Sequence, residues 1–233
     1  MIRLDRVSPN HGARRDGPVD ILLLHYTATA DAETAIDWLC DPQRQVSAHY
    51  VIDVDGTVYR LVEEAWRAWH AGVSFWGGCR DINSRSIGVE IVNAGEGCPP
   101  YPATQIDAVI ALSRDIQKRH GIPPQRVLGH SDVAPRRKQD PGEHFPWQRL
   151  ARAGVGLWPD APGPNPTTDT HAVQAMLSDY GYEIRVDGLA GPETQAVVTA
   201  FQRHFRPSAV TGQIDAETVA RLTSLLASTR SLG

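Results

Sequence analysis

A cluster of prolines between residues 155 and 169 constrains the possible folds of this chain more than any other feature. The segment VGLWPDAPGPNPTTD carries prolines at positions 159, 162, 164 and 166 and has almost no periodic apolar pattern. Closely spaced prolines disfavour helices and strands and favour an extended, semi-rigid linker. We therefore predict one domain over residues 1–155, a linker over 156–168 and a small domain over 169–233.

Upstream of the linker, apolar runs typical of strands recur along the chain. The run ILLLHY (21–26) is continuously apolar until its polar end, as expected of a strand buried on both faces. SIGVEIVN (86–93) and RVLGH (126–130) are predicted as further strands, and Asp55-Gly56 between two β-rich runs predicts a hairpin.

Helical patterns alternate with these strands. We expect one helix over 32–40 with Asp31 as its N-cap, and another over 104–120 with Thr104 as N-cap and Gly121 as its stop. Strands and helices in alternation predict an α/β domain of the α+β kind, in which a mixed sheet is flanked by helices.

Downstream of the linker, the apolar pattern is helical throughout. Three stripes at helical spacing predict three helices: Val173, Leu177 and Tyr180; Val197, Val198, Phe201 and Phe205; Val219, Leu222, Leu225 and Leu226. DGLAGPETQA and TGQIDAETVA form an internal repeat, with Gly188 and Gly212 lying 24 positions apart. Two copies are too few for a solenoid, so we predict a compact all-α three-helix domain.

Composition and the N-terminal sequence limit the kinds of partner and the cellular compartment that we expect. The formal net charge of −4 argues against a nucleic-acid partner, and no apolar run is long enough to cross a bilayer. The N-terminus lacks the apolar core of a signal peptide. The three cysteines, Cys40, Cys79 and Cys98, have no CxxC pairing; one disulfide is possible, and reduced thiols are the simpler interpretation. We expect a cytoplasmic monomer, or a periplasmic or extracellular protein if the N-terminus has been trimmed.

Three residues could form a catalytic metal site. His25 ends a buried strand, His130 ends another, and Asp140 follows in the loop GHSDVAPRRKQDPG. A catalytic zinc ion takes three nitrogen or oxygen ligands from the protein and leaves one position for water. For His25 alone a hydrogen-bonded core histidine is the simpler explanation, and for the RRKQD segment a charged surface loop is the alternative.

Two further residues could supply the remaining chemistry. Glu90 lies within an apolar strand, where a buried carboxylate costs free energy unless it is paired or has a shifted pKa. Beside a zinc-bound water it would act as the general base, and a structural ion pair is the alternative. Lys138 would point to the same side as Asp140 if that stretch is extended, and could stabilise an oxyanion.

The segment WRAWHAG (66–72) sets His70 beside Trp69. Aromatic faces suit sugar rings, and an imidazole suits an amide carbonyl, so the segment is predicted as a wall of a binding site. Tryptophans packed beneath a loop are an equally good explanation.

Taken together, these motifs resemble the amidase-2 family of N-acetylmuramoyl-L-alanine amidases, in its AmpD- and AmiD-like group. The resemblance covers roughly residues 8–150 and includes ILLLHYTAT, QVSAHYVIDVDGTVYRLV, RAWHAGVS, RSIGVEIVN and GHSDVAPRRKQDPG, in family order. It implies hydrolysis of the amide bond between L-alanine and N-acetylmuramic acid or its 1,6-anhydro form. Peptidoglycan fragments or wall polymer would be the partners.

The resemblance also implies roles for individual residues. The zinc ligands fall on His25, His130 and Asp140, the catalytic glutamate on Glu90 and the transition-state lysine on Lys138. We expect His70, Trp69, Asn93 and Ala134 to contact substrate. In related phage lysozyme-type amidases a tyrosine stands in place of Ala48 and a cysteine in place of Asp140; this chain has neither.

The stretch around Asp187, Gly188, Gly191 and Thr194 is similar to the D-G-x-x-G-x-x-T mark of a peptidoglycan-binding domain family. A wall-binding function for residues 169–233 is thus implied by resemblance. The alternative for the whole chain is a non-catalytic protein that recognises peptidoglycan, which would need an empty or purely structural metal site.

Overall fold

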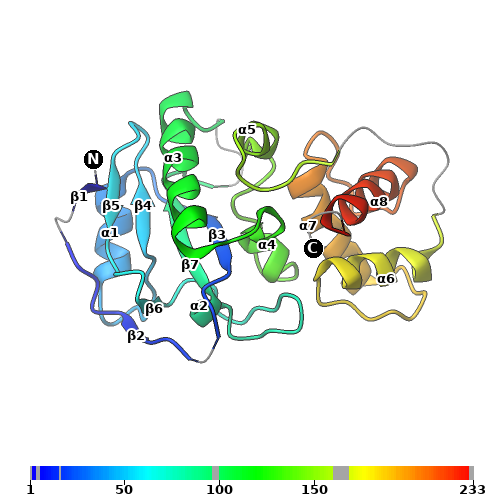
Figure 1. The fold of residues 1–233 in the computed structure, drawn as a ribbon, viewed down its shortest axis with the longest axis horizontal. Coiled ribbons are helices and arrows are strands. Elements are labelled where there is room, and N and C mark those ends of the chain that lie inside the picture. Colours follow the sequence, from blue (N-terminus) through cyan, green and yellow to red (C-terminus); the bar gives the residue numbers. More distant parts are fainter. Residues whose placement is uncertain (1, 4–5, 16, 96–99, 160–167, 231–233) are drawn as a thin grey trace.

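The computed structural model describes residues 2–3, 6–15, 17–95, 100–159 and 168–230. A six-stranded mixed sheet forms its centre, in the order β1-β5-β4-β7-β3-β8 (Figure 1). These strands are β1 (Ile2–Arg3), β3 (Ile21–Tyr26), β4 (Tyr50–Ile52), β5 (Val58–Arg60), β7 (Ser86–Ile91) and β8 (Val127–Gly129). A second, two-stranded sheet pairs β2 (His11–Ala13) with β6 (Trp66–Ala68). The predicted mixed sheet flanked by helices is confirmed.

Eight α-helices and one short 3-10 helix are found among the described residues. They are α1 (Ala32–Cys40), α2 (Ile82–Arg85), α3 (Ala103–His120), the 3-10 helix η1 (Pro124–Arg126), α4 (His130–Val133), α5 (Trp147–Arg152), α6 (Thr170–Tyr180), α7 (Pro192–Phe205) and α8 (Ala216–Arg230). None is long and apolar enough to cross a membrane. The three C-terminal helices, α6 to α8, lie together at one end of the molecule (Figure 1).

Helix boundaries follow the local sequence with one exception. Asp31 caps α1 by accepting a hydrogen bond from the Thr34 backbone at 2.7 Å, and Gly121 ends α3 in the left-handed region, both as predicted. The prediction of Thr104 as the N-cap of α3 is wrong. That helix begins one residue earlier, after Pro102, whose backbone has the extended geometry of a cap, and the Thr104 hydroxyl instead donates to the Val54 carbonyl.

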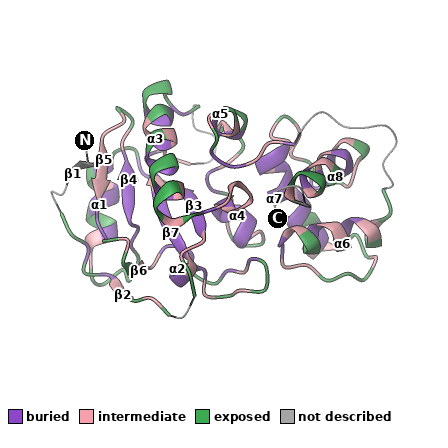
Figure 2. Ribbon diagram, in the orientation of Figure 1, coloured by how far each residue is buried: buried purple, intermediate pink, exposed green. Residues whose placement is uncertain are grey.

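The two faces of the central strands differ in chemistry. On β3, Leu22 and Leu24 pack in one hydrophobic cluster with α3, whereas Ile21 and Leu23 belong to another. On β7, Ile87, Val89 and Ile91 pack with α3, so Ser86, Gly88 and Glu90 point to the opposite face. Figure 2 shows the central strands as buried, and it is this second face that carries the polar residues of the site.

The first residues of the predicted linker pack against the hydrophobic clusters of the protein, which a proline-rich sequence does not predict. Leu157 packs against the cluster that contains the C-terminal helices, and Trp158 against the cluster beneath α3. Arg221 of α8 lies over the Trp158 ring at 5.5 Å. Residues 160–167 of the predicted linker lie outside the described residues. Cys40 and Cys79 are free thiols, and Cys98 also lies outside the described residues.

Candidate metal centre

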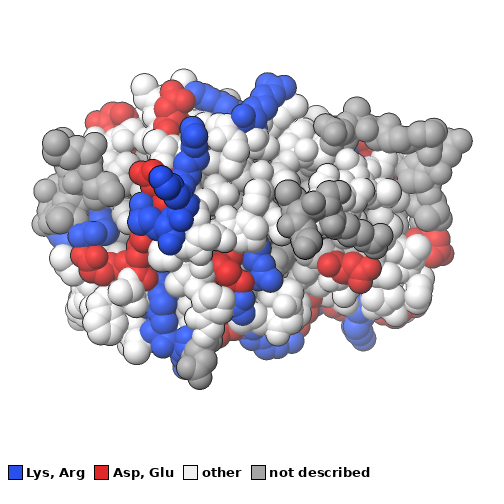
Figure 3. Space-filling view, viewed as in Figure 1, with Lys and Arg blue, Asp and Glu red and all other residues white. Residues whose placement is uncertain are grey.

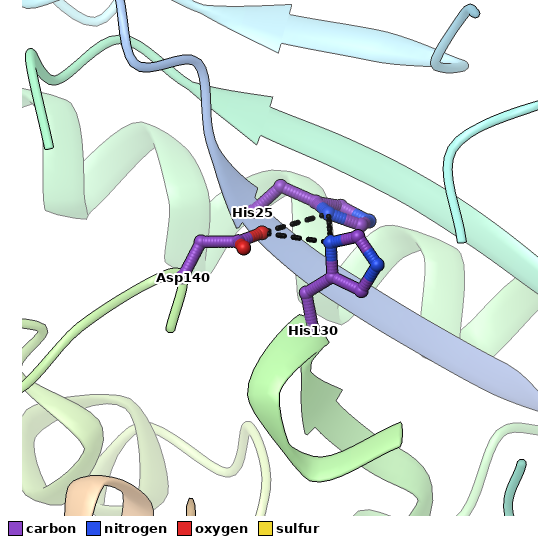
Figure 4. A group of neighbouring side chains, drawn as sticks. All are labelled: His25, His130 and Asp140. Atoms are coloured by element: carbon purple, nitrogen blue, oxygen red, sulfur yellow. Dashed lines mark hydrogen bonds and ion pairs between the residues drawn. The ribbon is translucent and has the colours of Figure 1, made fainter. Parts of the chain in front are cut away.

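Three buried side chains converge at the carboxyl ends of two parallel strands. His25 lies near the end of β3, His130 directly follows β8, and Asp140 comes from the loop after α4 (Figure 4). His25 Nδ1 and His130 Nδ1 are 2.9 Å apart, and each lies 3.0 Å from Asp140 Oδ2. The three side chains form a group whose ligand atoms could hold a metal ion.

Hydrogen bonds behind His25 determine which nitrogen carries its proton. Its Nε2 lies 3.0 Å from His70 Nδ1, and His70 Nε2 lies 3.3 Å from the Ser86 hydroxyl. That hydroxyl donates to the Ile82 carbonyl at 2.7 Å, so it must accept from His70. His70 Nδ1 is then an acceptor, and His25 carries its proton on Nε2.

His130 is oriented in the same way. Its Nε2 lies 3.0 Å from the Ala71 carbonyl, which can only accept, so the proton is on Nε2. Both Nδ1 atoms therefore present lone pairs to each other and to a carboxylate oxygen. Three lone pairs about 3 Å apart repel unless a cation lies between them. The donor set thus fits a metal ion.

The protonation states of these side chains suit a metal site. Burial, with His130 alongside, lowers the pKa of His25 to about 4, so the imidazole is neutral near pH 7. Neutral imidazoles and an ionised carboxylate are the forms that ligate metals.

Glu90 shares the sheet face and the level of His25. The two residues are register partners on the parallel strands β7 and β3, so their side chains project to the same side. Glu90 Oε2 is enclosed and has no hydrogen-bond partner among the described residues. Burial raises the pKa of Glu90 well above its ordinary value, the charge of Asp140 adds to this rise, and Lys138 opposes it.

One cavity joins these groups to the predicted substrate contacts. It is lined by Glu90, His130, Lys138 and Asp140 together with Trp69 and His70. Lys138 and Asp140 thus face one space. Lys138 follows a turn at residues 135–137, and Asp140 begins the next one. Asn93 and Ala134 do not line it: Asn93 pairs through its backbone with Thr27, and Ala134 lines a neighbouring groove with Val73 and Ser74.

Several cavity residues were not predicted from the sequence. Trp38 and Leu39 of α1 and Val46 form an apolar wall, and Trp38 is 42% exposed. In the structure the Arg44 guanidinium lies 4.5 Å from the centre of the Trp38 ring. The sequence gives no comparable signal, because the ordinary amphipathic pattern of α1 also explains a tryptophan at position 38. Acidic and basic side chains are interspersed over the face seen in Figure 3.

Comparison with known proteins agrees with this geometry. Residues 15–143 match the family Amidase_2, N-acetylmuramoyl-L-alanine amidase, and residues 167–222 match PG_binding_1, putative peptidoglycan binding domain. The chain is 38% identical to N-acetylmuramoyl-L-alanine amidase AmiD of Escherichia coli over 89% of its own length and 82% of the relative. It is 32% identical to 1,6-anhydro-N-acetylmuramyl-L-alanine amidase AmpD of Enterobacter cloacae, over 61% and 85%.

Solved structures extend the likeness to almost the whole chain. The complex of Escherichia coli AmiD with anhydro-N-acetylmuramic acid-L-Ala-D-gamma-Glu-L-Lys matches with a TM-score of 0.80 and 35% identity, over 97% of this chain and 92% of that one. Pseudomonas aeruginosa AmpDh3 in complex with anhydromuramic pentapeptide matches with a TM-score of 0.81 and 34% identity, over 91% and 92%. The chain therefore belongs to the N-acetylmuramoyl-L-alanine amidase family.

Proposed function

We propose that this protein hydrolyses the amide bond between N-acetylmuramic acid and L-alanine in peptidoglycan fragments, and that it does so with a zinc ion. The observation that carries the proposal is the convergence of three lone pairs, from His25, His130 and Asp140, beside a carboxylate with an unpartnered oxygen. AmiD and AmpDh3, which are similar over most of their length, have been solved with anhydromuramyl peptides bound.

Zinc is the metal that this donor set favours. Two imidazole nitrogens and one carboxylate oxygen form a three-ligand set typical of catalytic zinc sites, with a fourth position left open. When bound there, zinc polarises the scissile carbonyl and acidifies water. His25 and His130 would supply their Nδ1 atoms and Asp140 its Oδ2.

Glu90 and Lys138 would perform the proton transfer and charge stabilisation. A carboxylate with a raised pKa and a free oxygen is suited to take a proton from the attacking water and to return it to the leaving amine of L-alanine. The cation of Lys138 lines the same cavity and makes no ion pair with any residue that the structure describes, so its charge is available to a developing oxyanion.

Substrate would lie along the cavity wall. Trp69 offers an aromatic face for the sugar, and the exposed Trp38 lies on the same cavity. His70, Asn93 and Ala134 remain predicted contacts. We expect the helices from residue 169 onward to bind wall polymer as a second domain, and the chain to be a monomer; light scattering on the purified protein tests the latter.

Compartment is part of the same proposal. We favour a cytoplasmic enzyme that acts on anhydro-muropeptides, with free thiols at Cys40 and Cys79 as support. A wall-binding domain would equally suit an exported enzyme that meets polymer. The choice of substrate distinguishes the two.

The test is a mass-spectrometric digest of a soluble anhydro-muropeptide and of whole sacculi, with and without a chelator. We expect chelator-sensitive release of free peptide from the soluble fragment, restored by added zinc. Release from sacculi as well would indicate a broad wall amidase. Stoichiometric zinc without cleavage of either substrate would overturn the enzymatic proposal in favour of a peptidoglycan-recognition protein.

A further inference from the structure

The C-terminal helices share a hydrophobic cluster with the sheet that carries the metal centre. Trp76 and Val133 from the N-terminal part of the chain belong to the same cluster as Tyr182, Phe201 and Phe205. The Trp76 ring packs directly on the backbone of Gly181, where a Cβ atom would lie only 2.7 Å from the ring. Such packing is that of one core rather than of two domains joined by a flexible linker.

A buried carboxylate lies at the centre of this contact. Asp132 of α4 is 1% exposed and accepts three hydrogen bonds. Two come from the C-terminal helices and their connection: the Tyr182 hydroxyl to Oδ1 at 2.6 Å and His204 Nδ1 to Oδ2 at 2.7 Å. The third comes from the backbone of Gly129 to Oδ2 at 2.8 Å. Both oxygens of Asp132 therefore depend on donors from the C-terminal part of the chain.

His204 is itself held in one orientation. Its ring is stacked between Trp147 and Phe205, with ring centroids 3.7 Å and 3.8 Å away. Its Nε2 is enclosed and has no hydrogen-bond partner among the described residues, so Nδ1 is the nitrogen that carries the proton towards Asp132. An aromatic sandwich with one aimed donor is a rigid support for a carboxylate.

Asp132 connects this support to the metal centre through the backbone. Gly129 and Asp132 lie on either side of His130 in sequence, and their hydrogen bond closes the turn that presents the His130 ring. The next residue, Ser131, donates its backbone N–H to the Asp140 carbonyl at 3.0 Å. Helix α4 has only four residues and cannot maintain itself without tertiary contacts. The positions of His130 and Asp140 thus depend on a turn that Asp132 closes.

We propose that Tyr182 and His204 are positioning residues of the metal centre, which act on His130 through Asp132. The C-terminal helices are then a part of the metal site as well as a domain for wall polymer. This inference rests on the proposed function, because it takes His25, His130 and Asp140 as the metal ligands. Removing the Tyr182 hydroxyl takes the donor away from Oδ1, and removing the His204 imidazole leaves Oδ2 with the Gly129 N–H alone. Either change loosens the turn that carries His130.

The experiment measures zinc affinity in the full chain by competition with a chromophoric chelator, together with the visible spectrum of the cobalt-substituted protein. Tyr182→Phe removes a single hydroxyl, and His204→Leu removes the second donor. We expect each to weaken zinc binding about tenfold, the range for residues that orient a metal ligand, and to change the cobalt spectrum. His204→Asn, which keeps a donor near the Nδ1 position, should restore most of the affinity.

Val219→Ala is the matched control, because Val219 is buried in the C-terminal helices and is not among the partners of Asp132. It should lower the melting temperature while leaving zinc affinity and the cobalt spectrum as in the wild type. Unchanged affinity in Tyr182→Phe and His204→Leu, or an equal loss in Val219→Ala, would overturn the inference while the proposed function stands. A wild-type chain that binds no zinc would overturn both.

Discussion

Buried polar side chains have different roles in the two parts of this molecule. In the C-terminal helices, Gln174 and Gln202 are fully buried, and the side-chain amide of each holds a turn in place. The amide oxygen accepts two backbone N–H groups, and the amide nitrogen donates to a carbonyl and a threonine hydroxyl. At the strand ends, two imidazoles and a carboxylate present lone pairs to one another, and one Glu90 oxygen has no partner in the part of the chain that the structure describes. Satisfied polar groups stabilise a fold, whereas several lone pairs that converge on one point beside an unpartnered carboxylate oxygen indicate a ligand site.

The internal repeat has a physical basis in these glutamines. Gln174 holds the turn at Gly188 and bonds Thr194, and Gln202 holds the turn at Gly212 and bonds Thr218. Gly212 has a φ of +69°, and a Cβ atom there would lie 2.8 Å from the Thr199 hydroxyl. Each repeat is therefore one glycine turn tied to the preceding helix by a buried amide.

Glu90→Gln gives the largest expected effect and tests the unsatisfied side of the comparison. Because the amide cannot take the proton from water, kcat on an anhydro-muropeptide should fall about 10³-fold, equivalent to about 4 kcal/mol of barrier. Zinc content, measured by atomic emission, should stay at one per chain because Glu90 is not in the ligand set. Turnover near the wild-type rate would remove Glu90 from the mechanism.

Gln202→Leu tests the buried polar groups whose hydrogen bonds are satisfied. The side chain keeps its volume, but the buried Gly212 N–H and the partly buried Thr211 N–H lose their acceptor, so the free energy of unfolding in urea should fall by about 3 kcal/mol. Gln195→Leu, on the exposed face of the same helix, should change it by less than about 0.5 kcal/mol. Equal effects would mean that the buried amide contributes nothing beyond its packing.

Glu64 extends the comparison to a satisfied carboxylate in the N-terminal part. Burial raises its pKa, but hydrogen bonds from Arg119, His120 and Tyr50 outweigh burial and lower it to about 2, from an ordinary value of 4.5. Because the folded-state pKa is the lower one, the resulting stability is complete above pH 4.5 and is lost as the pH falls towards 2.

Glu64→Gln should therefore lower the free energy of unfolding at pH 7 by about 2 kcal/mol, a value reduced from the full shift because Arg119 is 45% exposed. The difference from wild type should shrink as the pH falls below 4.5. Glu63→Gln is the control, since the Glu63 side chain is 58% exposed and should contribute little at any pH. A pH-independent difference for Glu64→Gln would contradict the electrostatic explanation.

Local sequence patterns predicted much of this architecture but few of the hydrogen bonds that orient the residues of the site. Strands such as Ile21–Tyr26 and the cap at Asp31 depend on neighbours in the chain, so periodicity and capping rules identify them. The predicted metal residues came together because parallel strands end at one edge of a sheet. The bonds between His204 and Asp132, and between His70 and His25, join residues 72 and 45 positions apart, and no local pattern indicates such pairs.

His70 is the residue for which sequence and structure favour different roles, and it carries the smallest predicted effect. The sequence predicts a substrate contact, whereas the structure places its Nδ1 as the acceptor that holds the His25 proton on Nε2. The close approach of the His70 ring to Gly88, where a Cβ atom would lie 2.5 Å from it, fixes the ring in that position. His70→Phe keeps a ring but removes the acceptor, so zinc affinity should fall about tenfold, or about 1.4 kcal/mol. His70→Asn can accept the same hydrogen bond and should recover most of that loss. If His70→Phe binds zinc as tightly as the wild type and only raises KM, His70 contacts substrate and does not orient His25. The polar groups behind the metal ligands would then be structural, like the buried glutamines.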